Sequence, residues 1–210
     1  MRIFFGATIP DQIKSKIGEL QNELFAFEPG ARLESKSKLH ITLQFIGEFG
    51  KDGLEELFAS ARNDLNKSSV GFSPVRLAGM NYFPNEKMKR GIWIDCSDDG
   101  SLSKIARTIE LSSAKYGVTP EQRGYKPHIT LARLKEYRGR KESSIDLQKF
   151  WSESKLGVER FVPRSVALFE SFMNPDRSGS EYRILHEFPL QESEGASADL
   201  DGQKGSSKNG

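Results

Sequence analysis

The chain has 210 residues and is 36% hydrophobic, which is enough apolar sequence to bury a sizeable core and too much for a disordered chain. Its formal net charge of +2 combines a tail of 19 residues at −2 with a remainder at +4. A single cysteine, Cys96, excludes an internal disulfide framework and a cysteine-rich zinc site, and no apolar run is long enough for a membrane span.

The hydrophobic pattern predicts both strands and helices along most of the chain. Strands are expected at 3–9, 39–46, 72–80, 91–96, 128–134, within 158–172, and at 182–190. Helices are expected at 11–27, 54–65, 102–116 and 145–151. Because strands and helices do not alternate one for one, as a parallel doubly wound sheet requires, we predict an α+β fold of mostly antiparallel sheet.

The two ends of the chain differ in character. The apolar start is short and is followed at once by charged residues, which favours a first strand over a signal peptide. Without an export signal or disulfides, a cytoplasmic location is expected. Residues 192–210 contain no aromatic residue and one Leu, so we predict a folded domain over 1–191 and a disordered polar tail over 192–210.

Two of the three histidines stand in the same tetrapeptide. Residues 40–43 and 128–131 both read His-Ile-Thr-Leu, each follows a lysine by two residues, and each comes after a predicted helix. The repeat indicates two related lobes. A single His-x-Thr is most often an ordinary half-buried strand, but a matched pair in a chain with three histidines favours a shared function.

Strand geometry predicts what these tetrapeptides present. Side chains alternate between the faces of a strand, so His40 and Thr42 share one face, as do His128 and Thr130. The Ile and Leu residues between them would anchor each strand in its lobe. If the polar faces of the two lobes meet, two imidazoles and two hydroxyls surround one cleft.

This arrangement suits displacement at phosphorus. A neutral imidazole can take a proton from water, and a protonated one can give a proton to the leaving oxygen. The Thr hydroxyls can donate to phosphate oxygens as charge develops. No metal or cofactor is implied, because two histidines without carboxylates or cysteines make a poor metal site.

Other candidates are weaker. His186 has no Thr two residues later and is interpreted as structural. Tyr82, Phe83 and Trp93 could stack on a base, but core or cleft-wall roles are favoured. The segment 123–141 carries seven basic residues against one acidic residue, which suits RNA, although a solvated basic loop is the favoured interpretation of such a charge run by itself.

The sequence resembles the 2H phosphoesterase superfamily, and within it the RNA 2′,3′-cyclic phosphodiesterases, also called 2′-5′ RNA ligases. The resemblance covers about residues 1–190. It is carried by the segments 2–10 (RIFFGATIP), 39–48 (LHITLQFIGE), 126–133 (KPHITLAR), 168–171 (LFES), Tyr182 and 188–190 (FPL).

The resemblance implies two α+β lobes around a central cleft and hydrolysis of a terminal RNA 2′,3′-cyclic phosphate to a 2′-phosphate. It implies that His40 is the general acid, His128 the general base, and that Thr42 and Thr130 hold the phosphate. It also implies that Arg133 binds substrate. Strict alternation places Arg133 on the face opposite His128, so a bulge or an early strand end would be needed.

The expected partner is RNA with a 2′,3′-cyclic phosphate end, with tRNA fragments and cyclic nucleotides among the candidates; no protein or membrane partner is implied. Two alternatives remain open. The cleft could bind a nucleotide or an RNA end without turnover, or it could join RNA ends through a 2′-5′ linkage at the same site.

Overall fold

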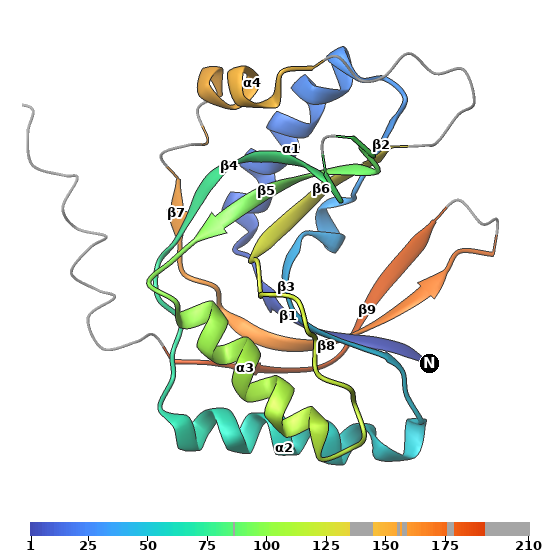
Figure 1. The fold of residues 1–210 in the computed structure, drawn as a ribbon, viewed down its shortest axis with the longest axis vertical. Helices are drawn as coiled ribbons and strands as arrows, with labels where there is room; N and C mark the ends of the chain where they lie inside the picture. Colours follow the sequence, from blue (N-terminus) through green and yellow to red (C-terminus); the bar gives the residue numbers. More distant parts are fainter. Residues whose placement is uncertain (86, 135–144, 155, 157–158, 176–178, 192–210) are drawn as a thin grey trace, which may run out of the picture.

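The computed structural model describes residues 1–85, 87–134, 145–154, 156, 159–175 and 179–191. Its framework is two antiparallel sheets (Figure 1). Sheet A has the strand order β3 (His40–Glu48), β1 (Arg2–Thr8), β8 (Ser165–Met173) and β9 (Ser180–Pro189). Sheet B has the order β2 (Ala31–Leu33), β6 (His128–Leu134), β5 (Gly91–Ser97), β4 (Val75–Phe83) and β7 (Arg160–Phe161).

Each sheet has its own helices. Helix α1 (Asp11–Phe27) packs against β2 and β6, and α4 (Leu147–Glu153) packs against β4. Helix α2 (Leu54–Ser68) packs on α3 (Ser101–Ala114), which contacts β3. Figure 1 shows α1 and α4 beside sheet B, with α2 and α3 beneath sheet A. The short 3-10 helices η1 (Lys36–Lys38) and η2 (Lys51–Gly53) lie on either side of β3.

The predicted α+β class is confirmed, and the sheets are antiparallel in every pair. Each sheet contains one His-Ile-Thr-Leu strand, but the sheets do not correspond to the two halves of the chain. Sheet A combines β1 and β3 with β8 and β9 from the far end. After β1 the chain passes from sheet A to sheet B, where α1 packs on β2 and β6, and it returns to sheet A at β3.

The amphipathic pattern accounts for the helices. Helix α1 has the predicted bounds and buries Ile13, Ile17, Leu20 and Leu24 on one face. The third helix is shorter than predicted: it ends at Ala114, and Gly117 follows at a φ of +79° that favours glycine. Strand β4 begins at Val75 and continues to Phe83, later than predicted at both ends.

The sequence did not predict two short strands, β2 with three residues and β7 with two, because neither is long enough to show the alternation of polar and apolar residues that marks a strand. The predicted tail 192–210 and the part of the basic segment from 135 to 141 lie outside the described residues.

Candidate active site

A pocket opens between the two sheets and brings together all five site residues that the sequence predicted. Sheet A, sheet B and the segment between β2 and β3 all contribute to it. Its lining residues are Glu34, Lys38, His40, Thr42, Phe45, Phe83, Trp93, His128, Thr130, Arg133 and Tyr182.

The predicted division of faces in the two tetrapeptides is confirmed. The Ile and Leu side chains are buried in the core, whereas the His and Thr side chains line the pocket. The apolar residues are Ile41, Leu43, Ile129 and Leu131, none more than 4% exposed. The apolar face therefore fixes each strand, and the polar face is presented to the same space.

The two histidines are held in the same way. The Nδ1 atom of His40 lies 2.6 Å from the carbonyl oxygen of Lys38, and that of His128 lies 2.8 Å from the carbonyl oxygen of Lys126. Because a carbonyl can only accept, Nδ1 carries the proton in both rings. In each neutral ring the Nε2 atom therefore carries the lone pair. In His40, Nε2 is 3.0 Å from Oγ1 of Thr42.

Aromatic side chains support both imidazoles. The ring of His40 lies 4.8 Å from that of Phe4 and 5.3 Å from that of Phe169, and Phe4 and Phe169 stack on each other. The ring of His128 lies 4.3 Å from Trp93, which stacks on Phe83. These rings restrict the imidazoles to one orientation and exclude water from one side of each.

Burial lowers the pKa of both histidines. The pKa of His40 falls to about 4, mainly through burial; the bond to the Lys38 carbonyl opposes this shift, and nearby His128 adds to it. Burial also lowers the pKa of His128, where the Lys126 carbonyl and Asp95 act in the opposite direction. Burial thus favours the neutral form of both rings in the free protein.

A β-bulge brings Arg133 into the pocket. In the pairing of β5 with β6, Trp93 is opposite Thr130 and Ile92 is opposite Ala132, so Leu131 is the extra residue. The bulge reverses the alternation after Thr130, and Arg133 faces the same side as the histidine. This is the bulge that the Arg133 assignment required.

The same irregularity occurs in the first motif. Between β1 and β3, Phe5 is opposite Gln44 and Gly6 is opposite Thr42, so Leu43 is the extra residue. Phe45, five residues after the first histidine, therefore reaches the pocket as Arg133 does five residues after the second. The two motifs share their backbone geometry but differ at this position, one apolar and one cationic.

Four lining residues that were not predicted complete the pocket: Glu34, Lys38, Phe45 and Tyr182. Glu34 is buried, forms an ion pair with Lys38, and accepts from Nε of Arg133 at 3.2 Å. The Nζ atom of Lys38 lies 5.2 Å from the centre of the Tyr182 ring. Phe45 and Tyr182 carried a signal in the sequence, because both belong to the segments that carry the family resemblance.

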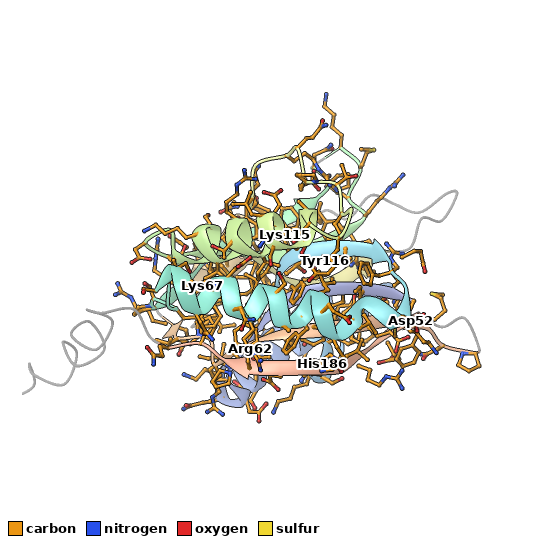
Figure 2. The ribbon with its side chains drawn as sticks, turned by 90° about the horizontal axis from the view of Figure 1, so that it is seen from below. Asp52, Arg62, Lys67, Lys115, Tyr116 and His186 are labelled. Atoms are coloured by element: carbon orange, nitrogen blue, oxygen red, sulfur yellow. The ribbon has the colours of Figure 1, made fainter. Side chains whose placement is uncertain are left out.

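The weaker candidate residues lie outside the pocket or form part of its wall. His186 packs on Phe58 of α2, with Nε2 3.3 Å from Glu55, on the face of sheet A away from the pocket (Figure 2). Tyr82 is buried in the core, whereas Phe83 and Trp93 form pocket wall. Cys96 is buried too, and burial raises the pKa of its thiol.

Within the described ranges, no three His, Cys, Asp or Glu side chains are grouped so that they could hold a metal ion. None of the helices in that part of the chain is both long and apolar enough to cross a membrane.

The chain is similar to known proteins over most of its length. The family model described as LigT-like phosphoesterase matches residues 8–93 and 94–177, so that each match contains one His-Ile-Thr-Leu strand. The RNA 2′,3′-cyclic phosphodiesterase of Archaeoglobus fulgidus is 30% identical over 190 residues, covering 90% of this chain and 99% of that protein. That of Methanocaldococcus jannaschii is 29% identical over 188 residues, covering 90% and 100%.

Solved structures share the fold. The crystal structure of Escherichia coli LigT complexed with 3′-AMP matches with a TM-score of 0.70 at 21% identity, over 91% of this chain and 98% of that one. The same protein complexed with phosphate matches with a TM-score of 0.64 at 19% identity, over 91% and 98%.

Proposed function

Because the chain belongs to the LigT-like phosphoesterase family, within the 2H phosphoesterase superfamily, we propose that it is an RNA 2′,3′-cyclic phosphodiesterase that needs no metal. It would open the cyclic phosphate at an RNA end and leave a 2′-phosphate. The names of the relatives support the reaction class. The observation that carries the mechanism is the meeting of two His-x-Thr faces at one pocket.

The reaction needs one base and one acid. Nε2 of His128 takes a proton from water, and the water oxygen bonds to phosphorus. The bond between phosphorus and the 3′ oxygen breaks, and Nε2 of His40 gives that oxygen a proton. The products are a 2′-phosphate and a 3′-hydroxyl, and solvent then removes the proton from His128 and restores one to His40. The division of roles between the histidines comes from the family resemblance, since both rings present Nε2 in the same way.

The remaining lining residues suit the phosphate. The hydroxyls of Thr42 and Thr130 can donate to its non-bridging oxygens, where charge develops in the transition state. Arg133 donates a hydrogen bond from Nε to Glu34. The two terminal nitrogens of its guanidinium can therefore donate to other acceptors, such as phosphate oxygens. Lys38 adds a second cation beside His40. Together these groups hold an anion between the two Nε2 atoms.

The lowered pKa of His40 is compatible with a role as acid only when the phosphate is bound. An anion close to the imidazole favours the protonated form, so the bound substrate raises the pKa that burial lowers. In the proposed cycle, substrate binding therefore favours protonation of His40, the proposed acid.

End-group analysis tests the proposal. A short RNA with a 2′,3′-cyclic phosphate is incubated with the protein in EDTA, and the ends are separated as 2′-phosphate, 3′-phosphate and joined product. We expect 2′-phosphate with many turnovers. Stoichiometric binding with no new phosphomonoester would favour the binding alternative, and accumulation of 2′-5′ joined RNA with a 5′-hydroxyl partner strand would favour end joining.

A further inference from the structure

Sheet A has an open face that continues beyond the pocket. The core face of β1 carries Ile3, Phe5 and Ala7, and the opposite face carries Arg2 and Phe4. Helices α2 and α3 lie on the core side of the sheet, as Figures 1 and 2 show. Among the described residues, the short helix η1 contacts β9 on the other side of the sheet, with Lys38 over the ring of Tyr182, and no α-helix packs on this side of the β1–β8–β9 part.

The strand register identifies what this open face presents. Arg2 is opposite Ser171, and Ser171 is opposite Tyr182, so these three side chains share the face of Phe4. By the same pairing, Ile184 is opposite Phe169, and Met173 is two residues beyond Ser171. Phe45 joins the set opposite Phe4. We call Arg2, Phe45, Ser171, Met173, Tyr182 and Ile184 the strand platform.

The strand platform is unusually apolar for an exposed surface. Phe45 is 64% exposed, Met173 59% and Ile184 45%, although they lie on three different strands of one sheet face. An antiparallel sheet normally turns polar residues toward water on its open face. Flat apolar and aromatic groups on an open sheet face provide stacking surface for unpaired bases.

Cations lie at both margins of this surface. Arg2 is exposed at the start of β1, close enough to Tyr182 to lower its pKa against the larger effect of burial. Arg32 is opposite Arg133 in the β2–β6 pair, and its guanidinium reaches Gly179 just before β9. Arg32 thus extends from sheet B toward the hairpin of β8 and β9. A chain of phosphates crossing the platform would meet positive charge at each side.

The platform is continuous with the pocket, since Phe45 and Tyr182 belong to both. We propose that the strand platform binds the single-stranded nucleotides that lie 5′ of the cyclic phosphate. This inference rests on the proposed function, because an RNA held by its terminal phosphate leaves the pocket across this rim. A protein partner would need no such continuity with the site of phosphate binding.

Two substrates separate the platform from the chemistry. One is 2′,3′-cyclic AMP, which has no nucleotide beyond the pocket, and the other is a pentaribonucleotide ending in the same cyclic phosphate. The measured quantity is the ratio of kcat/KM for the pentanucleotide to kcat/KM for the mononucleotide. Base stacking is worth about 1–3 kcal/mol per base, so the wild-type ratio is expected to be about 10 or more.

The platform variants are Arg2→Ala, Met173→Ser and Ile184→Ser, none of which lines the pocket. Each is expected to lower the ratio about three-fold or more, and Arg2→Ala is expected to weaken its dependence on salt. The matched controls are Arg183→Ala and Phe172→Ser, which are exposed neighbours on the opposite face of the same strands. Their ratios are expected to equal that of the wild type.

The possible outcomes are distinct. A ratio unchanged in the platform variants, or lowered equally in the controls, overturns the platform, and a protein-binding role for this face would give the former result. If the wild-type protein hydrolyses neither substrate, the proposed function fails first. Because the readout is a ratio within one protein sample, a partial loss of folded protein in any variant cancels.

Discussion

Glu34 accepts a hydrogen bond from Nε of Arg133 at 3.2 Å, although the two residues are 99 positions apart. The carboxylate is 6% exposed and also forms an ion pair with Lys38, which is 8% exposed. One buried anion therefore holds both pocket cations. A planar guanidinium that is fixed through Nε has its remaining donors in a defined direction, which is what binding to a tetrahedral phosphate requires.

Replacing Glu34 by Gln should weaken substrate binding. The substitution keeps the shape but removes the charge that holds Arg133 and Lys38, and hydrogen bonds to charged groups contribute about 1.5–3 kcal/mol. We expect KM for 2′,3′-cyclic AMP to rise about 10-fold or more, with a smaller change in kcat. Steady-state kinetics at constant pH measure both.

Glu110→Gln is the matched control, because the side chain of that glutamate is 13% exposed and paired with an arginine, Arg107, but lies on α3 outside the pocket. A second test places Glu34→Gln in an Arg133→Ala background, where its effect should shrink because the group that it orients is gone. An effect of undiminished size in that background would contradict the positioning role.

Loss of either imidazole should remove the acid or the base. We expect His40→Ala and His128→Ala each to lower kcat roughly 10²–10⁴-fold on a cyclic nucleotide in EDTA. His186→Ala is the control, because His186 packs on the other side of sheet A. Near-wild-type turnover in either pocket variant would disprove the two-histidine mechanism, and activity that disappears with EDTA would disprove its metal independence.

The rate should be highest on the acid side of neutrality. A base works only above its pKa and an acid only below its own, and kcat/KM reports both groups in the free enzyme. Burial lowers the pKa of His40 to about 4 and lowers that of His128 below its ordinary value of 6.5. Because His40, the proposed acid, has the more strongly lowered pKa, the form with His40 protonated and His128 neutral is a minor form at every pH, and its fraction is largest between the two pKa values. We therefore expect a bell-shaped kcat/KM profile for a cyclic nucleotide with its maximum between about pH 4 and 6.5. A maximum above pH 7 would show that the free protein holds the rings differently.

Two glycine substitutions should have opposite effects on stability. A methyl group at Gly91 would collide with the Phe83 ring and lie 2.6 Å from the carbonyl oxygen of Ala132, beside the bulge. We expect Gly91→Ala to lower the free energy of unfolding by about 1–3 kcal/mol. Gly18 lies in α1 with open space around it, so Gly18→Ala should raise that free energy by about 0.5–1 kcal/mol. Urea denaturation compares the two; equal effects would refute the collision at the bulge.

The local pattern of polar and apolar residues predicted most of the helices and strands. The bounds of α1 and β6 follow from the period of their apolar residues, and the shared faces of His40 with Thr42 and of His128 with Thr130 follow from strand alternation. These features depend on residues a few positions apart. The two strands that sequence reasoning missed, β2 and β7, are too short for such a period, and they exist because neighbouring strands supply their hydrogen bonds.

By itself, the sequence determined the matched pair of His-x-Thr strands, their polar and apolar faces, and the α+β class, because backbone alternation is a local property. Only the tertiary structure decided which strands share a sheet, since β1 pairs with β3 and with β8 through hydrogen bonds between distant residues. It also decided the bulges at Leu43 and Leu131, which turn Phe45 and Arg133 into the pocket. The burial of Glu34 against Lys38 and Arg133 is likewise non-local, because the carboxylate loses its water only when the segment before η1 packs on β6.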